Sequence, residues 1–517
     1  MSGTTRRRWP ALLAAVGLLL PAASRADTAN SADLIARGKY LVTLSHCKSC
    51  HTADGGPAFA GGRYMPTPFG PLSTPNITPD KETGIGTWSE ADFDRALRDG
   101  IAKGGVHLYP VMPYPWFNHL TDDDLSAIHA YIFSLPPVHH PRPPSRISFP
   151  FNMRIGLVLW NWMFFKQGRF EPDPTRSAEV NRGAYIVNVL EHCGECHNKN
   201  NLLGDTGWAR HLQGGPLQHW YAPNITPDKD EGIGRFSEAQ VYSYLKYGYA
   251  EGMGTALGPM HETVDGSLSR MTDSDLHAVV GYLFSNAPRH DYKEAERSDF
   301  TGDQPQGAET YLNDCASCHQ ADGHGIEREV PALAGNGVVL AQGSDDILRV
   351  ILGGVEAQGG YGPMPALGSG MTDQQIAAVA NYVRQSWGNQ APPNAAPGEV
   401  AILRGKTHTL LNGTRPNGCP ALVQSDLARL VGDKQTGIAE TLNGIRLENM
   451  LQGVNSVLTK IRQADPKLAQ ADIVNGLTIA YCPVVEQLPN MTRQQKTALL
   501  DHFAERVYTQ LTTNLQD

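Results

Sequence analysis

Three short segments of the chain place two cysteines and a histidine at the same C-x-x-C-H spacing. They are Cys47–His51, Cys193–His197 and Cys315–His319. This spacing is that of c-type haem attachment, in which two thiols bond to the porphyrin vinyl groups and the adjacent imidazole binds the iron. One such motif also fits half of a zinc site or a thioredoxin-like redox pair. Three copies in one chain predict three covalently attached haem c groups.

The predicted ligands follow from these motifs. The attachment residues are Cys47, Cys50, Cys193, Cys196, Cys315 and Cys318, and the first iron ligands are His51, His197 and His319. An iron with protein ligands on both faces carries electrons, whereas an open face admits a substrate. A methionine thioether from a later loop is therefore the expected second ligand, and His/Met ligation raises the reduction potential.

The methionines of the loops supply that second ligand. Met112 and Met260 stand in register, about 148 residues apart, and Met364 lies between two prolines, so these three are the predicted ligands. Met65 and Met253 are weaker candidates for the first two sites. The histidine alternatives, given lower weight, are His107, His119, His192, His261 and His324.

Met271 and Met371 are not expected to bind iron. Each directly precedes a Thr-Asp pair that begins a helix, at the place where Leu120 stands in the first module. An apolar residue there packs onto the first turn of its helix, so both methionines are expected in the core.

The helices that must position these ligands can be located from caps and apolar spacing. A helix over residues 33–43 runs into the first motif, and a Gly/Pro-rich loop follows over 54–79. Ser89 is expected to cap a helix that ends at Asp99, and Thr121 a closing helix. Thr372 marks the same closing helix in the third module. This order of helix, loop with methionine and closing helix is typical of a class I cytochrome c domain.

An internal repeat indicates that the first two modules arose by duplication. The segment Pro-Asn-Ile-Thr-Pro-Asp-Lys occurs at residues 75–81 and again at 223–229. A single repeat at this offset indicates duplicated domains rather than a solenoid. Asn76 and Asn224 lie in N-x-T sequons, but we interpret them as turn residues of a loop that folds over the haem edge. The third module is shorter and lacks this loop.

Composition limits the remaining assignments. A length of 517 residues suggests three or four domains, and 41% apolar residues suffice for ordinary cores. The first 26 residues have the basic start, apolar run and small-residue cleavage site of an export signal. A net charge of −9 argues against nucleic acid and against electrostatic attraction of the whole chain to anionic lipid.

The fold class predicted is all-α, with three class I cytochrome c domains in tandem and a small C-terminal helical domain. The expected segments are a signal peptide (1–26), cytochrome c domains at 27–145, 173–292 and 304–390, an aromatic linker (146–172) and the C-terminal domain (400–517). The linker is interpreted as a helix packed between two domains, with a docking surface as the alternative.

The C-terminal domain contains no haem motif. Helical spacing is expected over 422–430, 438–461 and 492–511, with prolines between them. Cys419 and Cys482 are the two cysteines outside the motifs, and in an oxidising compartment they are expected to form a disulfide.

Residues 30–390 resemble the tri-haem cytochrome c subunits of bacterial membrane-bound dehydrogenases. The motifs that carry the resemblance are the three C-x-x-C-H sites, the two Asn-Ile-Thr-Pro-Asp loops, the Leu-Tyr-Pro-x-Met-Pro-Tyr loop and the Trp160–Trp162 linker. The family members serve enzymes that oxidise alcohols, gluconate, sorbitol, fructose or aldehydes in the periplasm. The resemblance does not extend to residues 400–517.

The resemblance implies a function in electron transfer. It implies that a separate flavoprotein, quinoprotein or molybdenum dehydrogenase subunit oxidises the substrate, and that three haems relay electrons to ubiquinone or another respiratory acceptor. It further implies a periplasmic protein attached peripherally to the inner membrane, with no catalytic residue of its own. The alternatives are a soluble periplasmic multihaem carrier and a self-sufficient haem oxidoreductase with one open iron site.

Overall fold

The computed structural model describes most of the chain. The described residues are 23–199, 211–217, 220–289, 304–326, 329–355, 361–406, 426–468, 470–489, 491 and 493–513. Residues 1–22 of the predicted signal segment and Cys419 lie outside them, so the export signal and the disulfide stay predictions. Within the described residues, helices dominate and the strands form short antiparallel pairs. The helix-rich class is therefore confirmed.

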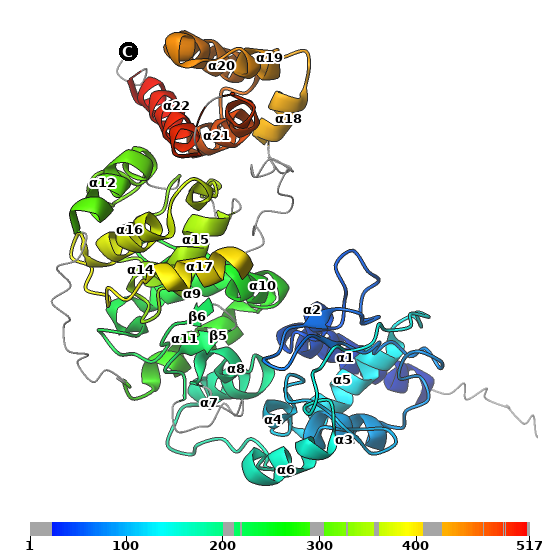
Figure 1. The fold of residues 1–517 in the computed structure, drawn as a ribbon. Coiled ribbons are helices and arrows are strands. Elements are labelled where there is room, and N and C mark those ends of the chain that lie inside the picture. The colour runs from blue at the N-terminus through cyan, green and yellow to red at the C-terminus, as the bar shows by residue number, and fades with distance from the viewer. Residues whose placement is uncertain are drawn as a thin grey trace, which may run out of the picture.

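Three pairs of crossing helices organise the part of the chain that carries the motifs (Figure 1). The pairs are α1 (Ala23–Leu44) with α5 (Asp122–Ser134), α7 (Ala178–Tyr185) with α11 (Asp273–Ser285), and α12 (Gln304–Asp314) with α16 (Asp373–Gln385). In each pair the first helix leads into a motif and the second follows the methionine loop. The helix predicted over 33–43 is therefore real but begins earlier, at Ala23.

A glycine makes each crossing close. A Cβ on Gly38 would lie 1.9 Å from the carbonyl oxygen of Ala127, and a Cβ on Gly183 would lie 1.9 Å from that of Ala278. In the third pair a Cβ on Gly307 would lie 2.5 Å from the carbonyl oxygen of Ala378. Because no side chain fits at these distances, glycine is required where the two backbones meet.

The predicted helix starts are confirmed. Ser89 accepts a hydrogen bond from the Asp92 amide at the start of α3 (Glu90–Asp99), and Thr121 caps α5 through the Asp124 amide. Thr372 caps α16 with a full capping box. Met271 and Met371 are buried in the cores beside these helix starts, as expected of residues that do not bind iron.

A π-helix, η1 (Ile186–Leu190), continues α7 towards the second motif. Gly183 precedes Cys193 by one residue more than Gly38 precedes Cys47. A π turn accommodates one additional residue without changing the helix direction. The π turn therefore absorbs the additional residue, and the second motif follows its helix crossing as the first motif follows its own.

The remaining elements are short and surround the motifs. The helices are α2 (Cys47–Cys50), α4 (Tyr114–Phe117), α6 (Ile155–Phe164), α8 (Gly194–His197), α9 (Glu238–Tyr247), α10 (Gly258–Gly266), α13 (Ala316–His319), α14 (Gly337–Leu340), α15 (Asp345–Gly353) and α17 (Pro397–Lys406). The strand pairs are β1 (Tyr64–Met65) with β2 (Leu72–Ser73), β3 (Ile101–Ala102) with β4 (Val106–His107), β5 (Gly215–Leu217) with β6 (Trp220–Ala222), and β7 (Tyr249–Ala250) with β8 (Gly254–Thr255).

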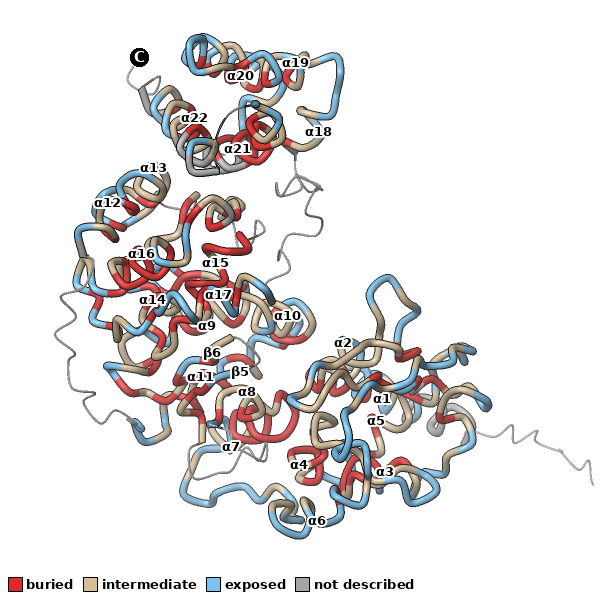
Figure 2. Tube along the Cα trace, in the orientation of Figure 1, coloured by how far each residue is buried: buried red, intermediate tan, exposed pale blue. Residues whose placement is uncertain are grey.

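The buried apolar residues of the described chain form separate clusters. The elements around the first and second motifs share one cluster, which runs from Leu41 to Leu283. The elements around the third motif form a second cluster, and the C-terminal helices form another (Figure 2). The first two motifs therefore lie in one packing unit rather than in two independent ones.

The C-terminal helices differ in part from the expectation. They are α18 (Asp426–Gly432), α19 (Ile438–Asn443), α20 (Met450–Ala464), α21 (Gln470–Glu486) and α22 (Arg493–Thr513). The single helix predicted over 438–461 is two helices, separated by a 3-10 turn over Leu447–Asn449. The prolines between the predicted segments suggest a break where α21 lies, whereas Pro483 is inside the last turns of this helix.

The aromatic linker contains α6, and the two faces of this helix differ. Leu157 is the buried residue that this helix contributes, and Trp162 is 80% exposed. α6 lies near the margin of the molecule in both views (Figures 1 and 2). Leu157, Leu159 and Trp160 also line a cavity that the first two motifs face, so the interpretation as a helix packed between two haem domains stays a prediction.

Candidate haem sites

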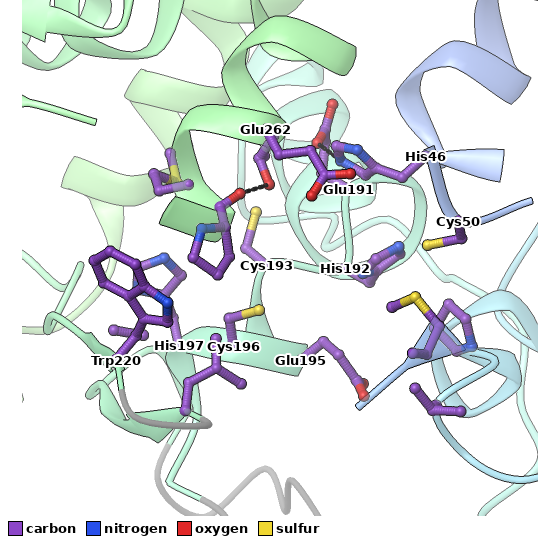
Figure 3. Close-up of a pocket in the computed structure, with 18 of the residues that line it drawn as sticks. His46, Cys50, Glu191, His192, Cys193, Glu195, Cys196, His197, Trp220 and Glu262 are labelled. Atoms are coloured by element: carbon purple, nitrogen blue, oxygen red, sulfur yellow. Dashed lines mark hydrogen bonds and ion pairs between the residues drawn. The ribbon is translucent and has the colours of Figure 1, made fainter. Parts of the chain in front are cut away.

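The first and second motifs face one shared cavity of about 950 Å³. Its wall contains the two cysteines and the histidine of each motif. Figure 3 shows Cys50 of the first motif and Cys193, Cys196 and His197 of the second. The predicted ligands Met112 and Met260 also line it, as do the weaker candidates Met65 and Met253. The structure thus brings the predicted donors of both sites together, and the choice among the methionines stays a prediction.

Each motif histidine is oriented by one backbone carbonyl. The Nδ1 atoms of His51, His197 and His319 lie 2.8, 2.7 and 3.0 Å from the carbonyl oxygens of Pro75, Pro223 and Pro331. A carbonyl only accepts, so Nδ1 carries the proton and donates, and Nε2 is left with its lone pair. Such a second partner orients the imidazole and makes it a better metal ligand.

Burial keeps these imidazoles neutral. It lowers the pKa of His51 and His197 below the ordinary value, and it lowers the pKa of His319 to about 4. The hydrogen bond to the proline carbonyl opposes this effect without cancelling it. A neutral imidazole is the form that binds a metal ion, so no proton has to be displaced near neutral pH.

The repeated Asn-Ile-Thr-Pro loop holds two of those carbonyls in place. Asn76 Oδ1 accepts from the Thr78 amide at 2.9 Å, and its Nδ2 donates to the Val138 carbonyl at 2.8 Å. Asn224 makes the same bonds to Thr226 and Arg289, both at 2.8 Å. Both asparagines are buried, which leaves no room for a glycan. They are turn residues, as the repeat predicted.

The motif thiols fit thioether attachment better than the two alternatives. Burial raises the pKa of Cys47 and Cys196 to about 12, and it also raises the pKa of Cys50 and Cys193. A dithiol redox pair needs a lowered thiol pKa instead. Among the described residues, no group of three or more His, Cys, Asp or Glu side chains is arranged for a metal ion, so a zinc site finds no ligand set there.

A reciprocal pair of tyrosines joins the first two motifs. Tyr40 donates to Asp275 at 2.8 Å, and Tyr185 donates to Asp124 at 2.7 Å, each reaching from one helix pair to the other. Each of these carboxylates also pairs with an arginine of its own helix pair: Arg37 contacts Asp124 at 2.6 Å and Arg182 contacts Asp275 at 2.7 Å. This is an isologous contact, in which the tyrosine of each unit contacts the equivalent aspartate of the other unit.

This contact was not predicted from the sequence, although a short repeated pattern accompanies it. Residues 37–40 read Arg-Gly-Lys-Tyr and residues 182–185 read Arg-Gly-Ala-Tyr. The shared R-G-x-Y pattern supplies the arginine, the crossing glycine and the exchanged tyrosine of each unit. The third helix pair lacks the pattern around Gly307, and its motif faces a different cavity.

Two histidines lie where the first two motifs approach each other. His46 and His192 precede the first cysteine of each motif, and their ring centroids are 5.7 Å apart. His46 Nε2 lies 2.7 Å from a carboxylate oxygen of Glu191 (Figure 3). Burial opposes protonation of His46, but the Glu191 carboxylate outweighs it and raises the pKa of His46. Burial lowers the pKa of His192 to about 3.

The histidine alternatives for the second ligand are placed as follows. His192 lines the shared cavity, whereas His107, His119, His261 and His324 are not part of the wall of either motif cavity. The structure therefore favours the methionines over these four histidines.

A tryptophan of α4 packs against the second motif. The indole Nε1 of Trp116 donates to Glu195 Oε2 at 2.6 Å, and Glu195 stands between the two cysteines of the second motif. A Cβ on Gly194 would lie 2.4 Å from the Trp116 ring. The second motif therefore needs glycine at that position because a side chain of the first unit packs against it.

The third motif faces a separate, narrower cavity of about 120 Å³. Cys315, Cys318, His319 and Met364 line it, so the predicted donors of this site are again brought together. Thr478 of α21 and Ala504 of α22 form part of the same wall. The Gln320 side chain donates to the Tyr508 hydroxyl at 2.9 Å. The C-terminal helices therefore cover one side of the third motif.

Comparison with known proteins agrees with this geometry. The family model for cytochrome c matches residues 35–136 and 305–387. Cytochrome c domains bind haem c covalently, so the chain carries at least this cofactor, and the residues at the motifs fit it.

Three relatives illustrate the wider similarity. The cytochrome c subunit of alcohol dehydrogenase (quinone) from Gluconacetobacter polyoxogenes is 38% identical over 395 residues, which is 72% of this chain and 84% of the relative. The gluconate 2-dehydrogenase cytochrome c subunit from Pantoea cypripedii is 36% identical, over 75% of this chain and 93% of the relative. The fructose dehydrogenase cytochrome subunit from Gluconobacter japonicus is 37% identical, over 69% and 79%.

These similarities cover most of each relative. The chain belongs to the family of cytochrome c subunits of alcohol, gluconate and fructose dehydrogenases.

Proposed function

We propose that the chain is the tri-haem electron-transfer subunit of a periplasmic dehydrogenase, built from three class I cytochrome c domains in tandem. A separate flavoprotein, quinoprotein or molybdenum subunit would oxidise a sugar, alcohol, sugar acid or aldehyde. The electrons would pass to ubiquinone or another respiratory acceptor. The observation that supports this proposal is the shared cavity, because the predicted donors of two haem sites line it within one packing unit.

The chain's own residues would hold and tune the cofactors. Each bound haem supplies one-electron oxidation and reduction of its iron. His51, His197 and His319 would hold the iron through Nε2, while the proline carbonyls keep each ring in one orientation. Met112, Met260 and Met364 would supply the second ligand, which would leave no site for a substrate.

Apolar walls give the shared cavity a further role in this proposal. Residues such as Phe117, Leu157 and Leu268 line it and limit access of water to the cofactors. A low-dielectric surrounding of this kind tunes the reduction potential of a haem. The sixth ligand and the burial together suit electron transfer rather than activation of a substrate on this chain.

The location of the protein is part of the proposal. Residues 1–26 would direct export and be removed, and the mature chain would lie in the periplasm at the face of the inner membrane. Residues 400–517 would form a helical domain closed by a disulfide between Cys419 and Cys482.

Purification of the native chain from host membranes tests the proposal. In mild detergent, a large dehydrogenase subunit should co-purify at equal stoichiometry. Adding alcohols, gluconate, sorbitol, fructose or aldehydes in turn should identify one substrate class that reduces the haems of the complex. Recovery of the chain alone from the soluble fraction, with no substrate-driven reduction, would contradict it.

A further inference from the structure

The C-terminal helices have a hydrophobic core of their own. Its buried residues come from α18 to α22 and include Tyr481, Phe503 and Val507. No helix in the described part of the chain is long and apolar enough to cross a membrane. Figure 2 shows the C-terminal helices at the end of the molecule that carries α12 and α13, and α22 packs against both. One side of this region therefore meets the third module.

The two cysteines of the third motif pack against different cores. Cys315 packs against the core of its own module, as Cys47 and Cys193 pack against the core of the first two. Cys318 packs against the core of the C-terminal helices. The third motif therefore stands between two cores, and one of them belongs to a region without a haem motif.

The C-terminal helices also supply part of the third cavity wall. Thr478 of α21 and Ala504 of α22 line this cavity and are 4% and 8% exposed. The Thr478 hydroxyl donates to the Val474 carbonyl at 2.7 Å, so its hydrogen bond is made within α21. Neither side chain therefore needs a water molecule in the cavity.

Gln320 fixes α22 on the motif. This residue directly follows the motif histidine and has a φ of +63°, which residues other than glycine adopt rarely. Its backbone carbonyl accepts from the Tyr311 hydroxyl of α12 at 2.5 Å. Its side-chain amide donates to the Tyr508 hydroxyl of α22 at 2.9 Å. One residue thus joins both helices at the point where the motif ends.

Another side of the third cavity meets the second haem site. Leu257 and Val338 line both this cavity and the shared cavity, so they separate the two. The Gly337 amide donates to the Met253 carbonyl at 3.1 Å across the same boundary. The third haem would thus meet the second site on one side and the C-terminal helices on another.

Burial of a haem changes its reduction potential. The ferric haem carries one more positive charge than the ferrous haem, and an apolar surrounding disfavours the more highly charged state. Helices that replace water beside the third haem therefore raise its potential relative to that of an uncovered haem.

We propose that the C-terminal helices complete the third haem site, with Thr478 and Ala504 beside the cofactor, and that they hold the potential of this haem above that of an uncovered one. The inference rests on the proposed function for the presence of a third haem. The match of the cytochrome c family model to residues 305–387 supports that presence.

Redox titration of the full-length holoprotein, with chemical mediators and without a dehydrogenase, tests the proposal. The test variant is Ala504→Glu, which adds a carboxylate to the wall of the third cavity. The matched control is Thr509→Glu, which adds the same charge at an exposed position of the same helix. Ala504→Gln adds a side chain of the same size without the charge. Cys315→Ala/Cys318→Ala removes the attachment thiols, so the midpoint potential that it lacks is that of the third haem.

A carboxylate beside the haem stabilises the ferric state. At about pH 8, where this carboxylate is ionised, the midpoint of the third haem should be lower in Ala504→Glu by at least about 59 mV, a tenfold change in the equilibrium constant for one electron. The other two midpoints should not change, and Thr509→Glu should leave all three unchanged.

Ala504→Gln separates two causes of this fall. A larger fall with glutamate than with glutamine shows the effect of the charge at the cavity wall. An equal fall in both variants shows that the larger side chains displace the helices and admit water, which lowers the same midpoint. Both results support the proposal, because in each the C-terminal helices determine the potential of the third haem.

Two results would overturn the proposal. One is an unchanged midpoint of the third haem in both Ala504 variants. The other is an equal fall of this midpoint in Ala504→Glu and Thr509→Glu, since the charge would then act from a distance and not from the cavity wall. Either result with three haems per chain contradicts this inference alone, whereas two haems per chain in the wild type would contradict the proposed function as well.

Discussion

A single hydrogen bond at each motif determines which nitrogen of the histidine is offered to iron. Nδ1 of His51, His197 and His319 donates to a proline carbonyl, and burial keeps the ring uncharged. The carbonyls belong to loops that are themselves fixed, in two cases by a buried asparagine. The first ligand is therefore preorganised by the chain.

The second ligand can be tested one site at a time. Met112→Ala, Met260→Ala and Met364→Ala should each convert one haem from low spin to high spin, because each opens one iron face. Electron paramagnetic resonance of the purified holoprotein measures this change. Low-spin haem throughout in any of the three variants would contradict that assignment.

Met271→Ala is the matched control for this series. Met271 is buried beside the start of α11 and is not part of either cavity wall. Its replacement should lower the free energy of unfolding by about 2–5 kcal/mol through the cavity it leaves. All haems should stay low-spin in this variant.

At the scale of elements, the crossing of two helices sets the position of each motif. Gly183→Ala should lower the free energy of unfolding by at least about 2 kcal/mol, because the new methyl group meets the Ala278 carbonyl and forces α7 away from α11. Gly281→Ala on the same α11 has no atom within 4 Å of the new Cβ. It should stabilise the protein by roughly 0.5–1 kcal/mol through helix propensity.

Chemical unfolding of both glycine variants measures this difference. Equal effects of the two substitutions would show that the close crossing is not what requires glycine.

A buried carboxylate lies between the elements of the second and third motifs. Asp346 of α15 accepts a hydrogen bond from the Tyr221 amide of β6 at 2.7 Å. Burial raises the pKa of Asp346 to about 7, against the opposing effects of the Tyr221 amide and then of Arg349 and Arg384. The folded protein therefore holds a proton that the unfolded chain releases between about pH 4 and pH 7. Its free energy of unfolding should fall as pH rises through this window.

Asp346→Asn tests this account, because an amide oxygen still accepts from Tyr221 and carries no charge to bury. The variant should be more stable than the wild type at about pH 8, by at most about 4 kcal/mol, and little changed at about pH 4. Urea unfolding across this range gives the slope. Asp345→Asn keeps Asp346 and should keep a slope of the same sign, somewhat reduced because the Asp345 charge adds to the rise of the Asp346 pKa. A wild-type slope in Asp346→Asn would contradict the assignment.

The elements that could be predicted are those with a local signal. Ser89, Thr121 and Thr372 start their helices through bonds to residues three positions away, so sequence alone locates them. α21 was missed because Pro483 is tolerated inside the helix, and nothing nearby in the sequence announces that. The aromatic segment predicts a helix at α6 but does not tell which of its faces is covered.

The residues of the candidate haem sites could also be predicted only where the sequence carries a local signal. The cysteines, histidines and methionines follow from spacing and repeats, and the structure gathers them. The bonds to the proline carbonyls could not be predicted, because every residue has a backbone carbonyl. The exchange of Tyr40 and Tyr185 could not be predicted either, because each tyrosine contacts an aspartate far away in the sequence. The repeated R-G-x-Y pattern can be related to this contact only when the crossing of the helices is known.

At the scale of the whole molecule, the first two motifs form one unit and the third is covered by C-terminal helices. The elements of the first two share a core and a cavity, while Thr478 and Ala504 close one side of the third. The third site is thus shielded by a part of the chain that carries no haem motif.

The contact between Gln320 and Tyr508 should help to hold that cover. Tyr508→Phe removes the hydroxyl that accepts from Gln320, and it should cost about 0.5–1.5 kcal/mol of local stability. Hydrogen–deuterium exchange should become faster at Cys315–Gln320 and stay unchanged at Cys47–His51. Equal exchange at both motifs in this variant would show that the bond does not hold the C-terminal helices in place.

We expect one chain to hold three six-coordinate haems for electron transfer. Pyridine haemochrome analysis of the purified holoprotein, combined with electron paramagnetic resonance of the oxidised form, tests it most directly. We expect three haems per chain, all low-spin, with the first two magnetically coupled because their sites share a cavity. Two haems per chain, or a stoichiometric high-spin signal in the wild type, would contradict the account.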